Sequence, residues 1–155
     1  DKELESACVS FELRFAQIRD LKKVLRAEAI VYGRLPLMIA ENCLVQNETG
    51  CRLDRQGPCV PEDGPCRCGQ PNVLVDRTGA AFPLLPAYGH RTEIQNSKPL
   101  YLADRPEHRR LGLAYARLRF TTETAEECVS VVQNYLDAAP AAGDFTRGLY
   151  ERGVE

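Results

Sequence analysis

The pattern of apolar and polar residues near the start of the chain predicts a strand, a helix and a second strand. Apolar and polar residues alternate over residues 7–15, which is the period of a half-buried strand. Over residues 16–26 the apolar residues recur at helical spacing. Residues 28–33 form a short β-branched and aromatic run that ends at Gly33. Because a helical crossover joins parallel strands, this order predicts a β-α-β unit.

The periodic pattern is lost after Cys43 and returns at residue 71. Two apolar runs within residues 71–85 flank the turn sequence DRTG at 76–79, and together they predict a β-hairpin. Further short elements follow the hairpin. They are strands at 91–97, 99–104 and 114–120, and a short helix at 105–113 that has a proline near its first turn.

The last predicted element is the most regular helix of the chain. Thr124 and Glu127 have the spacing of a capping box, and apolar residues keep helical spacing from there to Ala139, just before Pro140. Residues 140–155 contain two Arg-Gly pairs and no periodicity. We expect them to form a loop or linker that leads onward.

These elements predict an α/β fold made of two β-α-β-like pieces, with a hairpin-rich insertion at residues 41–98 between them. A chain of 155 residues is long enough for one domain with a real core, so residues 1–155 are expected to be a single domain. The chain begins at Asp1, its single methionine is internal, and an acidic stretch leads directly into the first strand. We therefore expect a piece of a longer protein.

Charge and composition exclude few functions. The formal net charge is -2 with both signs interspersed, so no basic surface predicts nucleic-acid binding, although RNA contact is not excluded. No apolar run approaches the roughly 18 residues of a membrane span, and residues 1–10 have neither the basic start nor the apolar stretch of a signal peptide. The seven cysteines are an odd number, which does not suit complete disulfide pairing. We expect a cytoplasmic protein without membrane contact.

The cysteines offer the first candidate chemistry. Five of the seven lie within residues 41–69, and they are Cys43, Cys51, Cys59, Cys66 and Cys68. Disulfides, free thiols and metal ligands are three open interpretations. A polar loop rich in Pro and Gly differs from the surroundings of an ordinary buried thiol, and converging thiolates bind zinc, copper(I) or iron-sulfur iron. Paired C-x-x-C knuckles are absent, so the spacing alone does not decide among the three.

The usual catalytic motifs are missing. The sequence contains no Gly-rich phosphate loop, no G-x-S-x-G and no H-E-x-x-H, and its two histidines are His90 and His108. His108 stands among arginines on a predicted exposed helix, where we expect a solvated surface residue. Cys8 and Cys128 fall in predicted regular elements on packed or semi-packed faces, and we leave them out of the candidate site.

Five blocks of the sequence resemble the collagenase-like peptidases, the peptidase family numbered 32 among those of unassigned mechanism. The blocks are EAIVYGRLPLMIAENC, VLVDRTGAAFPL, EIQNSKPLYLAD, LRFTTET and DFTRGLYERGV, in this order from residue 28 to residue 154. The likeness spans nearly the whole chain and corresponds to the C-terminal half of the family's conserved core. The resemblance implies a partial, barrel-like α/β fragment with an inserted β-hairpin region that carries the cysteine-rich loop.

The resemblance also implies a chemistry. Several relatives are oxygen-independent hydroxylases of transfer RNA, ribosomal RNA or a quinone precursor, and they use a cysteine-bound iron-sulfur cluster. Glu28 and Gly33 match the family's strand signature, and Cys43 matches the cluster cysteine that follows it. Cys66 or Cys68 would supply the next ligands, with Cys51 or Cys59 as the alternative.

Two positions depart from the family pattern. Pro36 stands where relatives have an upstream cysteine, and His90 stands near a later one. Histidine binds iron in Rieske centres and binds zinc equally well, so the expected cofactor is an iron-sulfur cluster or zinc. The candidate metal ligands are Cys43, Cys51, Cys66, Cys68 and His90. Near His90, the side chains of Arg91, Asn96 and Ser97 have either substrate-binding or turn-forming roles.

Three functional hypotheses follow. In the first, the chain is the metal- or cluster-binding part of an enzyme that hydroxylates RNA and is inactive without the N-terminal half of its parent. In the second, a bound zinc activates water for peptide hydrolysis, although no water-activating His/Glu helix supports it. In the third, a structural zinc clips an assembly module, and the open edges of the sheet favour a homo-oligomer.

Overall fold

A computed structural model describes residues 5–21, 23–49, 67 and 70–151. The chain divides into two compact units, which we call unit 1 (residues 1–34 and 98–155) and unit 2 (residues 35–97). Each unit combines helices with a β-sheet, so the chain is mixed α/β as predicted. Over the described ranges, no helix has the length and apolar character needed to cross a membrane.

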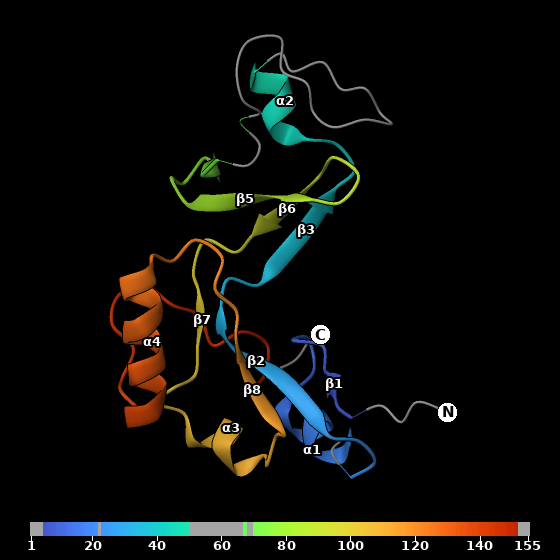
Figure 1. Ribbon diagram of the computed structural model, residues 1–155, viewed down its shortest axis with the longest axis vertical. Coiled ribbons are helices and arrows are strands. Elements are labelled where there is room, and N and C mark those ends of the chain that lie inside the picture. Colours follow the sequence, from blue (N-terminus) through green and yellow to red (C-terminus); the bar gives the residue numbers. More distant parts are fainter. Residues whose placement is uncertain (1–4, 22, 50–66, 68–69, 152–155) are drawn as a thin grey trace. The chain divides into compact units, whose positions relative to one another are not determined.

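Unit 1 begins with the β-α-β unit that the sequence predicts (Figure 1). Strand β1 (Ala7–Cys8) pairs in parallel with β2 (Ala27–Gly33), and helix α1 (Phe15–Leu21) connects them. Strand β1 is shorter than predicted because the alternating residues after Cys8 enter a turn. The Ser10 hydroxyl accepts a hydrogen bond from the Glu12 backbone at 3.2 Å, which stabilises that turn.

The second half of unit 1 differs from the predicted second β-α-β piece. Strand β8 (Tyr115–Leu118) is parallel to β2, but β7 (Leu100–Tyr101) pairs with β2 in the antiparallel direction. The β7 pairing covers only the end of β2, where Tyr32 and Gly33 lie opposite Tyr101 and Leu100. Strands β7 and β8 therefore run in opposite directions, and the helix between them does not form a parallel crossover.

Gly33 ends β2 for a steric reason. Its φ is +117°, and an added Cβ would lie 2.0 Å from the carbonyl oxygen of Arg119. The Arg119 backbone comes this close because its N–H donates to the Tyr32 carbonyl at 2.9 Å, and its guanidinium donates to the Arg34 carbonyl at 2.6 Å. Only glycine fits this conformation and this contact.

Helix α3 (Pro106–Arg110) corrects the prediction for His108. Its side chain is only 6% exposed, and its ring meets the ring of Tyr135 edge-on at 6.1 Å between centroids. The sequence predicts a surface histidine because two arginines follow it in the same short helix. His108 and Leu111 are three residues apart, however, and this pair forms the buried face of the turn.

Helix α4 (Ala125–Asp137) has the predicted capping box. The Thr124 hydroxyl accepts from the Glu127 backbone at 3.3 Å, while the Glu127 carboxylate accepts from the Thr124 backbone at 2.7 Å. The helix ends at Ala138, whose φ of 54° is left-handed. Its inner face brings Tyr135 between Tyr32 and Tyr101, with ring centroids 6.2 and 5.6 Å away.

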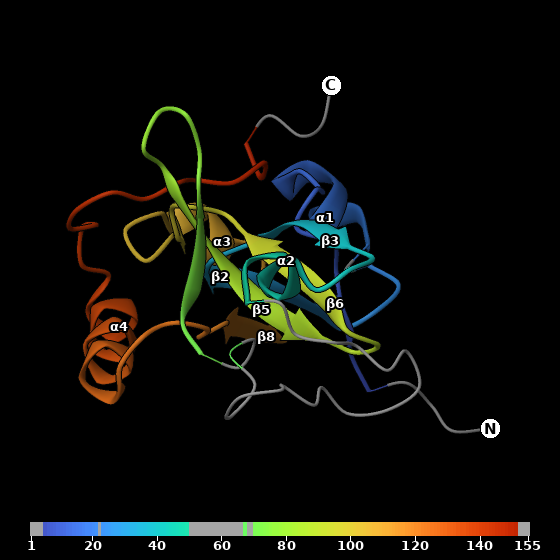
Figure 2. The ribbon, with the colours of Figure 1, turned by 90° about the horizontal axis from the view of Figure 1, so that it is seen from above.

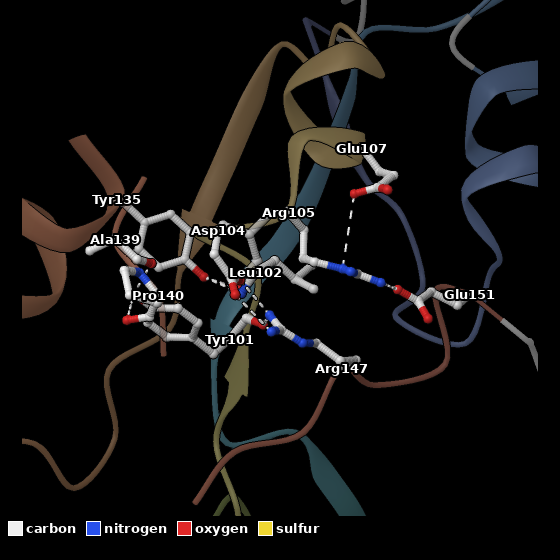
Figure 3. A network of polar contacts seen from close by, with 11 residues as sticks. Tyr101, Leu102, Asp104, Arg105, Glu107, Tyr135, Ala139, Pro140, Arg147 and Glu151 are labelled. Carbon is white, nitrogen blue, oxygen red and sulfur yellow. Dashed lines mark hydrogen bonds and ion pairs between the residues drawn. The ribbon is translucent and has the colours of Figure 1, made fainter. Parts of the chain in front are cut away.

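The segment after α4 has no regular element up to Glu151, yet it packs firmly into unit 1 (Figure 3). The Arg147 guanidinium binds both carboxylate oxygens of Asp104, at 2.5 and 2.8 Å, and the Tyr101 carbonyl at 2.8 Å. This pairing holds the pKa of Asp104 below its usual value. Tyr150 is 1% exposed, stacks on Phe15 at 5.1 Å and donates to the Ile30 carbonyl at 2.6 Å.

Unit 2 is a four-stranded antiparallel sheet with one helix packed on it. Its strands are β3 (Pro36–Ala40), β4 (Asn72–Val75), β5 (Ala81–Ala87) and β6 (Arg91–Gln95), in the order β3-β6-β5-β4. Helix α2 (Leu44–Thr49) lies over β5 and β6 (Figure 2). The predicted hairpin of β4 and β5 is confirmed. The Asp76 carboxylate accepts from the backbone of Thr78 at 2.7 Å and of Ala80 at 3.0 Å, which closes the turn.

We expect the packing of Tyr150 to stabilise unit 1 strongly. Tyr150→Ala should lower the free energy of unfolding by about 3–5 kcal/mol, because it empties a buried aromatic site. Tyr150→Phe should cost about 1 kcal/mol, since it removes only the hydrogen bond to Ile30. Urea unfolding followed by circular dichroism measures both. Tyr88, which is 96% exposed, supplies the control, and Tyr88→Ala should change stability by less than about 0.5 kcal/mol. Equal losses for Tyr88→Ala and Tyr150→Ala would contradict the packing argument.

Candidate metal centre

Cys43 lies in unit 2, between the end of β3 and the start of α2. It is a free thiol and only 6% exposed. Its neighbours in the core of unit 2 are Val45 of α2, Leu84 of β5 and Ile94 of β6. Leu84 and Ile94 are directly paired across β5 and β6, so they share the face of the sheet on which α2 rests. The thiol is therefore held against the sheet rather than extended into solvent.

Thr92 fixes the backbone on both sides of Cys43. Its hydroxyl donates to the Asn42 carbonyl at 3.2 Å and accepts from the Leu44 N–H at 3.0 Å. Thr92 is buried, so both hydrogen bonds are shielded from water. The Leu44 N–H is one of the first amides of α2 and has no partner within the helix, and the threonine satisfies it. The position of Cys43 thus depends on a residue of β6, a strand almost fifty residues away in the sequence.

The strand register brings the candidate residues to one end of the unit 2 sheet. Strand β3 runs toward that end, since Pro36 lies opposite Gln95 and Ala40 opposite Thr92. The turn between β5 and β6, which contains His90, lies at the same end because Ala87 is paired with Arg91. Strand β4 starts there as well. Its first residue pairs with Leu84 and its last with Ala81, so the chain enters β4 from the side of that turn.

His90 sits in this turn in a conformation that is uncommon for residues with a side chain. Its φ is 59°, and the preceding Gly89 also has a positive φ. Its side chain is half-buried. The next residue, Arg91, forms an ion pair with Glu41 at 3.0 Å. Arg91 follows His90 directly in the sequence, and Glu41 lies two positions before Cys43. This exposed pair orients the arginine and adds little stability.

The other predicted ligands lie outside the described residues. They are Cys51, Cys66 and Cys68, together with Cys59. Two described residues border them, and both are held by Asn72 at the start of β4. The Asn72 side-chain amide donates to the carbonyls of Arg67 at 2.8 Å and Gln70 at 2.7 Å. Asn72 thus anchors the chain to the sheet at the point where β4 begins.

A soft metal at this corner would need ligands from residues 50–69. Among the residues that the structure describes, no three His, Cys, Asp or Glu side chains come together closely enough to hold an ion. Cys43 itself suits such a metal, because a thiolate on a fixed backbone with an apolar surround is a typical ligand of zinc and of iron-sulfur clusters. Of the cysteines left out above, Cys128 is half-buried on α4, and Cys8 is exposed rather than packed as expected.

Sequence reasoning missed the role of Thr92. A threonine in a predicted strand has no distinctive spacing, and its partners are backbone groups near Cys43 that no side-chain pattern marks. No protein-family model, no curated protein and no solved structure matches this chain. The relation to the collagenase-like peptidases therefore stays a prediction from the five sequence blocks.

The burial of Cys43 predicts a difference in thiol reactivity. In metal-free folded protein, iodoacetamide should label exposed Cys8 at least about tenfold faster than Cys43, because alkylation of Cys43 needs local opening of the α2 corner. Peptide mapping by mass spectrometry gives both rates separately. Thr92→Val should speed the labelling of Cys43 and leave Cys8 unchanged. In urea the two thiols should react alike, and equal rates in folded protein would contradict the described corner.

Proposed function

We propose that the chain is the metal- or iron-sulfur-binding part of a protein of the collagenase-like peptidase family, and that the intact protein hydroxylates RNA without oxygen. In this proposal Cys43 is the fixed ligand of the centre. Cys51, Cys66 and Cys68 are the other sulfur ligands, and His90 is the candidate replacement for a fourth cysteine. Unit 1 belongs to the wall of an incomplete α/β barrel, which the N-terminal half of the parent completes.

One observation carries the metal part of the proposal. The buried thiol of Cys43, the turn of His90 and the start of β4, which follows the cysteine-bearing segment, lie at the same end of one small sheet. A metal site needs side chains that converge from separate parts of the chain. Antiparallel pairing brings such parts together at one end of the sheet.

The choice between an iron-sulfur cluster and zinc depends on the residues that surround the ligands. When bound, an iron-sulfur cluster supplies electron transfer, whereas zinc supplies a rigid link or a Lewis acid. Val45, Leu84 and Ile94 give Cys43 an apolar setting, which limits water access to a bound centre. The chain's own residues would hold and shield the centre. The RNA substrate is supported by the resemblance alone, since the net charge of -2 provides no general attraction for RNA.

Metal analysis of protein purified without oxygen tests this proposal. We expect iron together with matching acid-labile sulfide in the wild type, and loss of both in Cys43→Ser, because a hydroxyl is a poor ligand for soft iron. Cys128→Ser is the matched control, since Cys128 is a half-buried thiol of unit 1, and it should keep full iron and sulfide. His90→Ala should lower the iron content if the histidine is a ligand.

Other results would exclude parts of the proposal. Zinc without sulfide, lost in Cys43→Ser, would favour the structural clip or the peptidase. Hydrolysis of gelatin by the full-length protein, lost in the same variant, would then identify the peptidase. The absence of iron and zinc from every sample would exclude a metal site in this chain. For the RNA step, nucleoside mass spectrometry should find one added oxygen in RNA from cells with the intact protein and none after Cys43→Ser.

A further inference from the structure

Unit 1 contains a cavity of about 450 Å³ between α3, β8 and α4. Its walls are mainly apolar, and they are formed by Leu113, Ala116, Leu118, Val132 and Leu136. This volume lies within the range of small-molecule sites, which is about 300–1,000 Å³. The cavity lies wholly in unit 1, so it is independent of the cysteine corner in unit 2.

His108 is the buried polar group of this cavity. Its side chain is more than nine-tenths buried, yet its Nδ1 atom makes no hydrogen bond of normal geometry. Burial lowers the pKa of His108 and so favours the neutral ring, and the nearby Arg105 backbone opposes this shift only in part. The Nδ1 atom has almost no accessible surface, so a ligand in the cavity would contact other atoms of the ring.

Arg109 adds a permanent positive charge at the same cavity. Its side chain is exposed, and one guanidinium nitrogen donates to the Tyr135 carbonyl near the end of α4. This bond uses one of five donors, so others remain available for an anion. Within the described part of the chain no carboxylate forms an ion pair with Arg109. The pocket is apolar, and its guanidinium has no carboxylate partner within the described residues. It therefore favours a ligand with an apolar body and an anionic head.

We propose that this cavity binds a small aliphatic carboxylate, with its chain against the walls from β8 and α4 and its head at Arg109. The apolar surface supports a chain rather than a compact anion, because Val132 and Leu136 are exposed and continue along α4 to Val129, which is 70% exposed. These residues recur at helical spacing on one side of α4, so they extend the apolar wall beyond the cavity. Inorganic phosphate would leave this wall in water.

Titration of the full chain followed by ¹H–¹⁵N NMR tests the inference with three probes: octanoate, 1-octanol and inorganic phosphate. We expect saturable shifts with octanoate at α3, β8 and the C-terminal half of α4. Octanol should bind the same residues at least about tenfold more weakly, because it lacks the charge-assisted bonds to the head. Phosphate should cause no saturable shifts there.

Matched variants separate the head from the chain. Arg109→Gln should weaken octanoate binding by about tenfold and leave octanol binding unchanged. Arg110→Gln, on the same helix but outside the cavity, should change the affinity for neither probe. Ala116→Phe should abolish binding of both, because it fills the space next to Leu118. Ala116 is exposed, so this variant should remain folded, which its spectrum would verify.

Three outcomes would overturn the inference. The first is the absence of saturable octanoate binding by the wild type. The second is equal weakening by Arg109→Gln and Arg110→Gln, which would indicate only a general charge effect. The third is a set of shifts at Val129, Val132 and Leu136 that follows protein concentration rather than octanoate, which would show that a second copy of the chain covers this wall. None of these results bears on iron or sulfide content, so the two proposals fail separately.

Discussion

Unit 1 depends on the backbone of β2. This strand pairs with β1, β7 and β8, and it is the only described strand that contacts all three. Three of its carbonyls also accept from side chains or backbone far away in the sequence: Ile30 from Tyr150, Val31 from Tyr135 and Tyr32 from Arg119. A central strand whose carbonyls accept hydrogen bonds from later elements holds those elements in place. Gly33 then lets the Arg119 backbone pass at a distance that no side chain would allow.

The same physical device recurs in unit 2 on a smaller scale. In unit 1, phenol hydroxyls bind carbonyls of β2, and in unit 2 the Thr92 hydroxyl binds backbone groups on both sides of Cys43. In both places a buried side-chain oxygen replaces a missing backbone partner where regular pairing ends. Such bonds specify position more than they add stability, because each contributes only about 1 kcal/mol net. The candidate thiol is therefore precise in position although the element after it, α2, is short.

The sequence predicted the elements whose pattern is local. The capping box of α4, the apolar run of β2 and the Asp76 turn each depend on residues within a few positions, and all three formed as expected. The predictions for β1 and for His108 were wrong for different reasons. Strand β1 stops at a local turn held by Ser10, whereas His108 is buried because a distant element, α4, brings Tyr135 against it. For the candidate site, the sequence identified Cys43 and His90, but only the strand register brings them to one end of a sheet.

The geometry of this corner also bears on how a metal would act on the fold. Cys43 is fixed before any metal arrives, since Thr92 and the α2 packing hold it, and Asn72 anchors the return of the chain at β4. A metal that joined Cys43 to cysteines between these anchors would close loops within residues 43–68. Such a metal would bind folded unit 2 more tightly than the unfolded chain, so binding would stabilise unit 2. Because Leu84 and Ile94 line the same corner, this stabilisation would reach the sheet through packed side chains, and unit 2 would gain more from the metal than unit 1.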